Sequence, residues 1–217
     1  RLPKTGYYRF ASWIGDHDSG HNWRNGPKKM RYGPGDLRRW SNLDDVKLVA
    51  LQLWFETHHR IKKLDTRRRI VHFRAKSIGS LKDEWQQFAR YFVENVFEAL
   101  DTPGEWYLDR PTGKLYYLPL PGEEISSTEV IAPQLETLVH FAGTGKKAVS
   151  HVRLENLSLQ HAEWDYPPDD PGSIQAAYKV PGAVVFDRAE HCVLYGCEVA
   201  HAAQYAVEIR TGSHNNQ

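Results

Sequence analysis

Two carboxylates beside an indole ring are the residues of this sequence best suited to acid–base chemistry. Glu163 and Asp165 flank Trp164, shortly after His161. One carboxyl group can donate a proton while another accepts one, which is the chemistry that most glycosidases use. The flat face of Trp164 could support a sugar ring. We therefore predict Glu163 and Asp165 as catalytic residues.

Further side chains are predicted to contact a substrate around this pair. The predicted substrate-binding residues are His161, Trp164, Gln175, His201 and Glu208. His201 is expected to stack near His161, because the two occupy equivalent places in a repeat. A structural interpretation of the same cluster stays open. In that interpretation Asp165 caps a turn, Glu163 is solvated and Trp164 seals the core beneath a loop.

Other residue groups favour neither a metal nor an organic cofactor. Segment 16–21 holds two histidines and two aspartates, which are metal-ligand types. His17 and His21 would meet on one side only in a helix, and the neighbouring glycines favour a solvated loop. No glycine-rich phosphate loop, nucleophile elbow or Cys/His metal pattern occurs. The arginine run 67–69 is expected to be an exposed turn, with a phosphate or acidic-sugar site as the alternative.

Composition limits the expected partners. The chain has 217 residues and a formal net charge of +1, so nothing calls for nucleic acid or an anionic membrane surface. No apolar run approaches the roughly 18 residues that cross a bilayer. Cys192 and Cys197 are too few for a disulfide framework and are expected to fill core positions.

A repeat in the last third of the chain predicts the fold. Residues 151–161 and 191–201 are both apolar at the second, fourth, seventh and ninth positions, with Asn or Gly at the sixth. A short apolar strand precedes each copy. The next equivalent histidine, His214, follows His191 by 23 residues, about one coil of a parallel β-helix. The expected fold is therefore all-β, with about three coils of a right-handed parallel β-helix from about residue 138 onward.

The coils should share one interior. Val139, Val184 and Val207 are expected to be equivalent rungs that stack at about 4.8 Å, because each coil buries an inward row that it cannot cover alone. Asn156 and Gly196 suit a corner with positive φ. An open coil end would expose strand edges and apolar side chains.

The chain is expected to divide into three parts. Residues 1–45 are rich in Gly, Pro, Asp and Asn and should be loop-rich. Residues 46–122 should form an inserted β-rich subdomain of antiparallel strands, with an aromatic hairpin that turns at 111–113. Within it, residues 81–98 are predicted to form a short helix and then a buried edge. Residues 123–217 should form the β-helix coils, truncated at the C-terminus.

Five motifs carry a resemblance to known proteins: ENVFEALD at 94–101, PGEWYLDR at 103–110, LYY at 115–117, RWSN at 39–42 and LSLQH at 157–161. They resemble motifs of bacterial right-handed β-helix proteins similar to glycoside hydrolase family 141. The resemblance covers roughly residues 37–214. It implies a secreted or periplasmic carbohydrate-active protein from a group whose activities include fucosidase and xylanase. It also implies that the rest of the β-helix, with catalytic carboxylates, lies on coils beyond Gln217 that this chain lacks.

These observations together predict a fragment of a glycoside hydrolase that cleaves a polysaccharide or oligosaccharide with paired carboxylates and without a cofactor. A polysaccharide lyase on the same scaffold is one alternative. It needs a base, for which Lys179 and Arg210 are available, and often Ca²⁺ held by a dense acidic cluster, which is not visible. A non-catalytic glycan-binding or structural solenoid is the other. Whether this fragment is itself active stays open.

Overall fold

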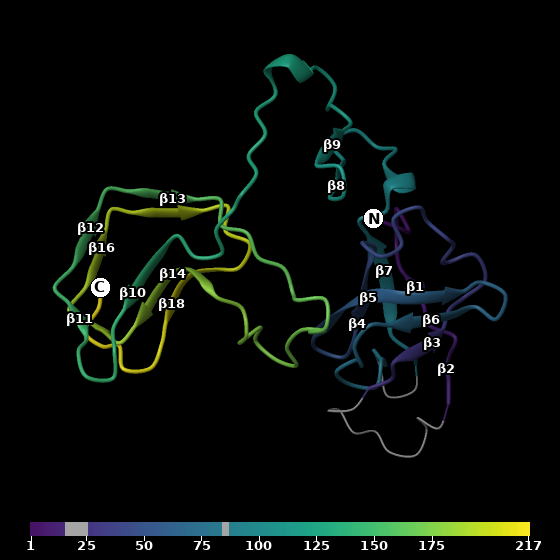
Figure 1. Cartoon of the computed structure of the whole chain (residues 1–217), viewed down its shortest axis with the longest axis horizontal. Helices are drawn as coiled ribbons and strands as arrows, with labels where there is room; N and C mark the ends of the chain where they lie inside the picture. The colour runs from purple at the N-terminus through teal and green to yellow at the C-terminus, as the bar shows by residue number, and fades with distance from the viewer. Residues whose placement is uncertain (16–25, 84–86) are drawn as a thin grey trace. The chain divides into compact units, whose positions relative to one another are not determined.

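The computed structural model describes residues 1–15, 26–83 and 87–217 and is all-β (Figure 1). Within those residues the only helices are two short 3-10 turns, η1 (Phe97–Ala99) and η2 (Ile125–Ser127). The expectation of an all-β chain is therefore confirmed.

The chain divides into two compact units with separate cores. The antiparallel unit comprises residues 1–128 and 166–178. The parallel unit comprises residues 129–165 and 179–217. Segment 166–178 interrupts the parallel unit in sequence but belongs to the antiparallel unit.

A seven-stranded sheet forms the centre of the antiparallel unit. In sheet order its strands are β1 (Tyr8–Arg9), β7 (Arg90–Glu94), β4 (Lys47–Leu51), β5 (Glu56–Asp65), β6 (Ile70–Phe73), β3 (Lys29–Arg31) and β2 (Ser12–Trp13). All neighbouring strands pair antiparallel. The antiparallel strands predicted in the first half of the inserted subdomain are confirmed.

Strand β5 shows how the sequence pattern builds this sheet. Thr57, His59 and Ile61 alternate with more exposed residues and face the core, because successive side chains of a strand point to opposite faces. A register shift between Ile61 and Lys63 then returns Leu64 to the core. The pair His58-His59 consequently points to opposite faces.

Residues 1–15 and 26–45 are mostly turns and loops, and they also contribute to the sheet and the core. They supply strands β1, β2 and β3 and bury Phe10, Met30 and Tyr32 in the main core. Strands of two or three residues leave little periodicity in the sequence, so the turn residues between them dominate the composition.

The helix predicted within residues 81–98 is wrong for the described part of that segment. Strand β7 occupies Arg90–Glu94, and Ala89, Tyr91 and Val93 are buried alternately. This spacing of two is that of a half-buried strand, and it outweighs the wider apolar pattern that favoured a helix.

The aromatic hairpin predicted from the sequence is confirmed. It consists of β8 (Trp106–Asp109) and β9 (Lys114–Tyr117), which pair antiparallel. At the turn Gly113 has a φ of 69°, and its N–H donates to the carbonyl of Asp109 (2.7 Å). Alternation along β8 places Trp106 and Tyr107 on opposite faces of the hairpin.

The parallel unit consists of four parallel pairings that recur in one order along the chain. Strands β10 (Val139–Ala142), β11 (Val149–Ser150), β12 (Arg153–Glu155) and β13 (Ser158–Gln160) pair with β14 (Gly182–Asp187), β15 (Ala189–Glu190), β16 (Val193–Tyr195) and β17 (Glu198–Ala200), respectively. Strand β18 (Tyr205–Ile209) then pairs in parallel with β14.

The register of these pairings confirms the predicted alignment of the repeat. Val139 pairs with Val184, which pairs with Val207. The corner residues Asn156 and Gly196 have φ values of 56° and 60°, as predicted. The two copies of the repeat therefore lie side by side, strand on strand.

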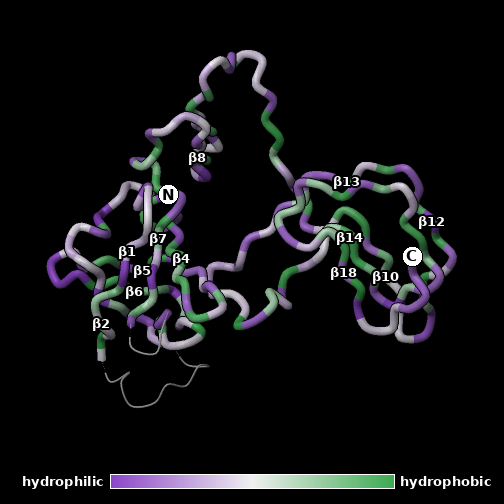
Figure 2. Tube along the Cα trace, turned by 180° about the vertical axis from the view of Figure 1, so that it is seen from behind, coloured by the Kyte–Doolittle hydropathy of each residue, from purple (hydrophilic) through white to green (hydrophobic). Residues whose placement is uncertain are grey.

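The core of the parallel unit is small. Its buried residues are Phe141, Val184, Phe186, Ala189 and Cys192. The rings of Phe141 and Phe186 stack with centroids 4.4 Å apart and planes at 9°. Figure 2 shows hydrophobic colour along β14 and its neighbouring strands. Both cysteines are free thiols, with Cys192 buried and Cys197 half-buried.

Strand β14 begins at Gly182, whose backbone lies close to β18. A Cβ atom at this position would lie 2.8 Å from the Cβ of Glu208 and 2.9 Å from its backbone nitrogen. Contacts that short would push the two strands apart, so the close pairing of β14 with β18 requires glycine here.

Candidate functional site

An open cleft of about 650 Å³ lies in the antiparallel unit. Its lining includes the rings Phe97, Tyr107 and Tyr116, the aspartates Asp44, Asp45 and Asp109, and the polar residues Ser41 and Asn42. These side chains come from the turn before β4, from η1 and from the β8–β9 hairpin. The volume is within the range of roughly 300–1,000 Å³ that small-molecule sites occupy.

Three rings form one wall of the cleft. Phe97 lies 5.1 Å from Tyr107 and 5.0 Å from Tyr116, centroid to centroid, with tilted ring planes. Tyr107 and Tyr116 are directly opposite each other in the hairpin register. Phe97 and Tyr116 remain 38% and 37% exposed, whereas Tyr107 is buried. The cluster therefore holds its rings in place and leaves apolar ring surface open to a ligand.

Two polar groups of the cleft are prepared for hydrogen bonding. Burial, followed by the negative charge of Asp45, raises the pKa of the Tyr107 hydroxyl, which is therefore protonated at neutral pH. Asn42 donates from Nδ2 to the carbonyl of Asn95 (2.7 Å), which fixes the amide. The Oδ1 atom of Asn42 is buried and has no hydrogen-bond partner in the described part of the chain, so a ligand could reach it only if the cleft rearranged.

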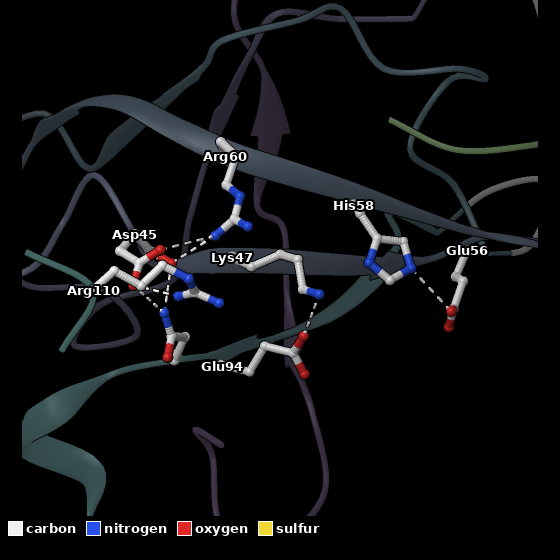
Figure 3. A network of polar contacts seen from close by, with 8 residues as sticks. Asp45, Lys47, Glu56, His58, Arg60, Glu94 and Arg110 are labelled. Carbon is white, nitrogen blue, oxygen red and sulfur yellow. Dashed lines mark hydrogen bonds and ion pairs between the residues drawn. The ribbon is translucent and has the colours of Figure 1, made fainter. Parts of the chain in front are cut away.

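Asp45 fastens the hairpin to the sheet (Figure 3). Its Oδ2 atom accepts from Arg110 Nη1 (2.6 Å) and from Asn95 Nδ2 (2.5 Å). Arg60 Nη1 donates to the Asp45 carbonyl (2.8 Å) and lies 3.5 Å from Oδ1. Two guanidinium groups and an amide thus orient one carboxylate. Asp45 forms a wall of the cleft and is not available as a free base.

A second row of charges continues across the same sheet (Figure 3). Lys47 on β4 pairs with Glu94 on β7 (2.9 Å). On β5, His58 Nε2 lies 3.0 Å from Glu56 Oε1, and this hydrogen bond lowers the pKa of Glu56. These contacts join neighbouring strands or nearby residues of one strand, so they support the sheet beside the cleft.

Segment 166–178 packs on this sheet and carries one predicted site residue. The ring of Tyr166 lies 4.9 Å from that of His58. The backbone N–H of His58 donates to the Pro171 carbonyl (2.9 Å). Trp54 donates from Nε1 to the Ile174 carbonyl (3.0 Å). Gln175 is exposed in this segment and therefore lies in the antiparallel unit.

The structure brings two predicted site residues of the parallel unit together. The rings of His161 and His201 stack with centroids 4.8 Å apart and planes at 3°. They follow β13 and β17, and both have positive φ values, 64° and 51°. The stacking predicted from the repeat is confirmed.

The remaining predicted residues of the parallel unit show different environments. Glu163 is exposed, and its N–H donates to the Leu135 carbonyl (3.0 Å). Trp164 and Asp165 are half-buried. The roles of these three residues in catalysis or binding stay predictions.

Glu208 is held within its own sheet. It forms two contacts of 2.9 Å with Arg210 and accepts from the Gly182 N–H (3.0 Å). The hydrogen bonds from Arg210 lower the pKa of Glu208. Its carboxylate is therefore ionised and already hydrogen-bonded to Arg210 and Gly182. A substrate hydroxyl that contacts Glu208 would bind the same carboxylate as these two groups.

The sequence prediction missed two polar arrangements. One is the cleft, whose rings belong to the motifs that carried the family resemblance but are brought together only by the hairpin. The other is on β13 and β17, where the Glu198 carboxylate accepts from Ser158 Oγ (2.9 Å) and Gln160 Nε2 (3.2 Å). Residues 40 positions apart in sequence meet there, and only the register of the repeat could have indicated it.

The described residues contain no group of three or more His, Cys, Asp or Glu side chains placed to hold a metal ion. The candidate ligands His17 and His21 lie outside the described residues. Across residues 1–15, 26–83 and 87–217, no helix has the length and apolar character to span a membrane.

Comparisons with known proteins give one structural likeness. No family model matches the chain, and no curated protein sequence matches it. A solved structure described as a glycoside hydrolase is similar, with a TM-score of 0.62 and 23% sequence identity. The match covers 72% of this chain and 33% of that structure, so this chain corresponds to about a third of its length. At this identity the likeness concerns the fold.

Proposed function

We propose that this chain is part of a carbohydrate-active protein and that the cleft of the antiparallel unit binds sugar. The observation that carries the proposal is the meeting of open ring faces with hydrogen-bonding groups in one cleft. A sugar ring has apolar C–H faces and hydroxyl edges, so it suits rings that lie beside polar acceptors. Phe97 and Tyr116 supply the ring faces, and Asp109 supplies a carboxylate acceptor.

The architecture supports a wider proposal about the parent protein. Parallel strands that recur in one order and in register are what stacked coils require, and we propose a right-handed parallel β-helix of about three coils. The fold likeness to a structure described as a glycoside hydrolase supports a carbohydrate-active parent protein. We further propose a secreted or periplasmic bacterial glycoside hydrolase related to family 141, which acts on a polysaccharide.

Glu163 and Asp165 are the proposed catalytic carboxylates, with His161 and His201 beside the substrate. One carboxyl group would protonate the leaving oxygen, and the other would activate water or attack the sugar carbon. Glu163→Gln and Asp165→Asn should each abolish release of reducing sugar while sugar binding in the cleft of the antiparallel unit stays unchanged. If the wild-type chain hydrolyses the substrate and both variants do so at the same rate, these assignments are wrong.

Calorimetric titration of the chain with uncharged oligosaccharides tests the cleft. Suitable probes are xylohexaose, cellohexaose and mannohexaose. Tyr116→Ala removes an open ring face and should weaken binding of the preferred sugar by about tenfold, or about 1.4 kcal/mol. The matched control is Tyr195→Ala, because Tyr195 is exposed on the parallel unit, outside the cleft. Equal losses for the two variants, or no binding of any probe, would contradict the proposal.

A further inference from the structure

A row of basic side chains lies on the outward face of the seven-stranded sheet. Lys29 on β3 pairs with His72 on β6, which pairs with Lys63 on β5. Directly paired residues project from the same face of a sheet, so the three side chains lie together. Both lysines are exposed, and His72 is half-buried. Their neighbours along the strands are buried in the core on the opposite face: Met30, Val71 and Leu64.

Further cations adjoin this row. Segment 62–69, which ends β5 and forms the turn to β6, carries five cationic side chains and a single carboxylate, that of Asp65. Asp65 accepts from the Arg68 N–H (2.9 Å) and is thereby held in the turn. Arg31 lies two residues along β3 from Lys29 and so projects from the same face. Its Nη1 donates to the Arg68 carbonyl (2.6 Å), which holds this guanidinium near the row.

The lysines of this face differ from other cations of the same unit, because they have no acidic partner. Within residues 1–15, 26–83 and 87–217, no carboxylate forms an ion pair with Lys29, Lys62 or Lys63. Charges of one sign without compensation attract counterions and raise their local concentration. The face is therefore suited to an anionic ligand. The cations that do pair elsewhere in the unit are Lys47 with Glu94, Arg90 with Asp83 and Arg110 with Asp45.

His72 occupies the middle of the row. Partial burial, followed by the charges of Lys29 and Lys63, lowers the pKa of its imidazole, so the ring is neutral at pH 7. A neutral imidazole has one N–H donor and one acceptor nitrogen. The row thus presents two cations separated by a group that can form a hydrogen bond with a hydroxyl.

The spacing of the two lysines favours an extended polyanion over a single anionic group. Neighbouring strands lie about 4.8 Å apart, so the backbones of Lys29 and Lys63 are about 10 Å apart across β6. To bind one carboxylate or phosphate together, both long side chains would have to converge over His72. A polymer with a charge on each unit can contact both lysines where they stand and place a hydroxyl at the imidazole between them.

We infer that the row Lys29–His72–Lys63 binds an acidic polysaccharide, a chain of uronate units, at a site separate from the cleft. None of the three residues lines the cleft. The choice of a polysaccharide as the polyanion rests on the proposed function. Proteins that bind single-stranded nucleic acid on a sheet stack the bases on aromatic rings. The row and the adjacent registered pair, Arg31 with Ile70, contain no Phe, Tyr or Trp, so they offer charge without a stacking platform.

Titration calorimetry of the full chain with hexagalacturonate tests the inference. The wild type should bind this probe in low salt and more weakly in 0.5 M salt, because salt screens exposed charges. The double variant Lys29→Gln with Lys63→Gln should lose about tenfold in affinity, as expected for two exposed charge contacts. Lys29→Arg with Lys63→Arg keeps both charges and should retain binding. The matched control, Lys146→Gln with Lys147→Gln, removes the same charge from exposed positions of the parallel unit.

The outcomes separate this site from the cleft. Equal losses in the Lys29/Lys63 and Lys146/Lys147 double variants overturn the inference, since attraction would then depend only on net charge. Tighter binding of an oligothymidylate of equal charge overturns it in favour of nucleic acid.

If the wild type binds xylohexaose but not hexagalacturonate, the inference fails and the proposed function stands. If it binds hexagalacturonate through the two lysines but no uncharged sugar, the cleft proposal fails and the inference stands. Far-ultraviolet circular dichroism of each variant confirms that the substitutions have not unfolded the chain.

Discussion

The two units bury their apolar side chains in different ways. In the antiparallel unit, a seven-stranded sheet and the segments around it enclose one large core that includes Leu48, Val93 and Phe73. In the parallel unit, burial depends on the place of a strand in the row. Val184 in the middle strand is fully buried, whereas Val207, in register with it, is 43% exposed. A row of parallel strands buries its inward side chains fully only where a strand has neighbours on both sides.

The comparison extends to titratable groups. The antiparallel unit encloses His59, which is only 2% exposed, stacks on Phe73 (4.4 Å) and lies 2.9 Å from the Thr57 hydroxyl through Nε2. The six histidines of the parallel unit are all exposed or half-buried. The closed core around His59 therefore keeps this ring neutral. We expect a fall in pH to reduce the stability of the antiparallel unit more than that of the parallel unit.

The largest expected effect is a loss of stability of the antiparallel unit in acid. Burial lowers the pKa of His59 from 6.5 to about 3. A group whose pKa falls on folding binds a proton more readily in the unfolded chain, so its stabilising effect is complete above pH 6.5 and declines as the pH falls toward 3. Over that whole window the loss is on the order of 4 kcal/mol.

Hydrogen exchange measured by mass spectrometry at pH 7 and pH 4.5, with correction for the intrinsic rates, reports each unit separately. Protection of β4 to β6 should fall more than that of β14 to β16. His59→Gln keeps a polar side chain but cannot gain a charge, so its pH dependence should be flatter whatever stability it loses at pH 7. An unchanged slope in this variant would show that other groups cause the acid sensitivity.

The second prediction uses two identical residues at equivalent places in the parallel unit. Val184→Ala should destabilise this unit by about 2 kcal/mol, because it leaves a void in a closed part of the core. Val207→Ala removes the same atoms from a half-open position and should cost about 0.5 kcal/mol. Urea unfolding followed through hydrogen exchange of β14 gives both values. Equal losses would mean that the two valines are equally buried in solution, and that the end of the row is closed.

The parallel unit was the more predictable of the two. Its two repeat copies can be aligned with each other, and the alignment indicates the spacing, the inward residues and the corners. The register of Val139 with Val184 and the positive φ of Asn156 and Gly196 therefore followed from the sequence. The antiparallel unit has no repeat with which to compare a predicted strand. Its shortest strands were hidden among turn residues. A helix was wrongly predicted ahead of a buried edge in residues 81–98, because the buried residues of β7 at a spacing of two also fit a longer apolar pattern.

The candidate site was predictable only in part. Stacking of His161 on His201 followed from the repeat. The cleft did not, since its rings come from η1 and a hairpin, and their meeting depends on how Arg110 and Asp45 join segments 65 residues apart. Long-range ion pairs of this kind leave no local pattern in a sequence. The residue types were visible, but the contact that brings them together was not.

That contact gives the smallest expected effect and compares two kinds of ion pair. Arg110 is 52% exposed and Asp45 22%, and the pair joins the hairpin to the sheet. In the parallel unit, Arg153 and Glu155 are 48% and 45% exposed and lie on one strand. Half-exposed pairs contribute little, so a double-mutant cycle of Arg110→Gln with Asp45→Asn should give a coupling energy of about 0.5–1 kcal/mol.

The matched cycle of Arg153→Gln with Glu155→Gln should give a value close to zero, because that pair lies within one strand and restrains no other element. Thermal unfolding in low salt and in 0.5 M salt measures both cycles, and screening should reduce the first. Since Arg110 also holds the wall of the cleft, Arg110→Gln should weaken oligosaccharide binding by more than its small effect on stability suggests. If coupling and affinity both stay unchanged, the hairpin is positioned by the packing of Phe97, Tyr107 and Tyr116 alone.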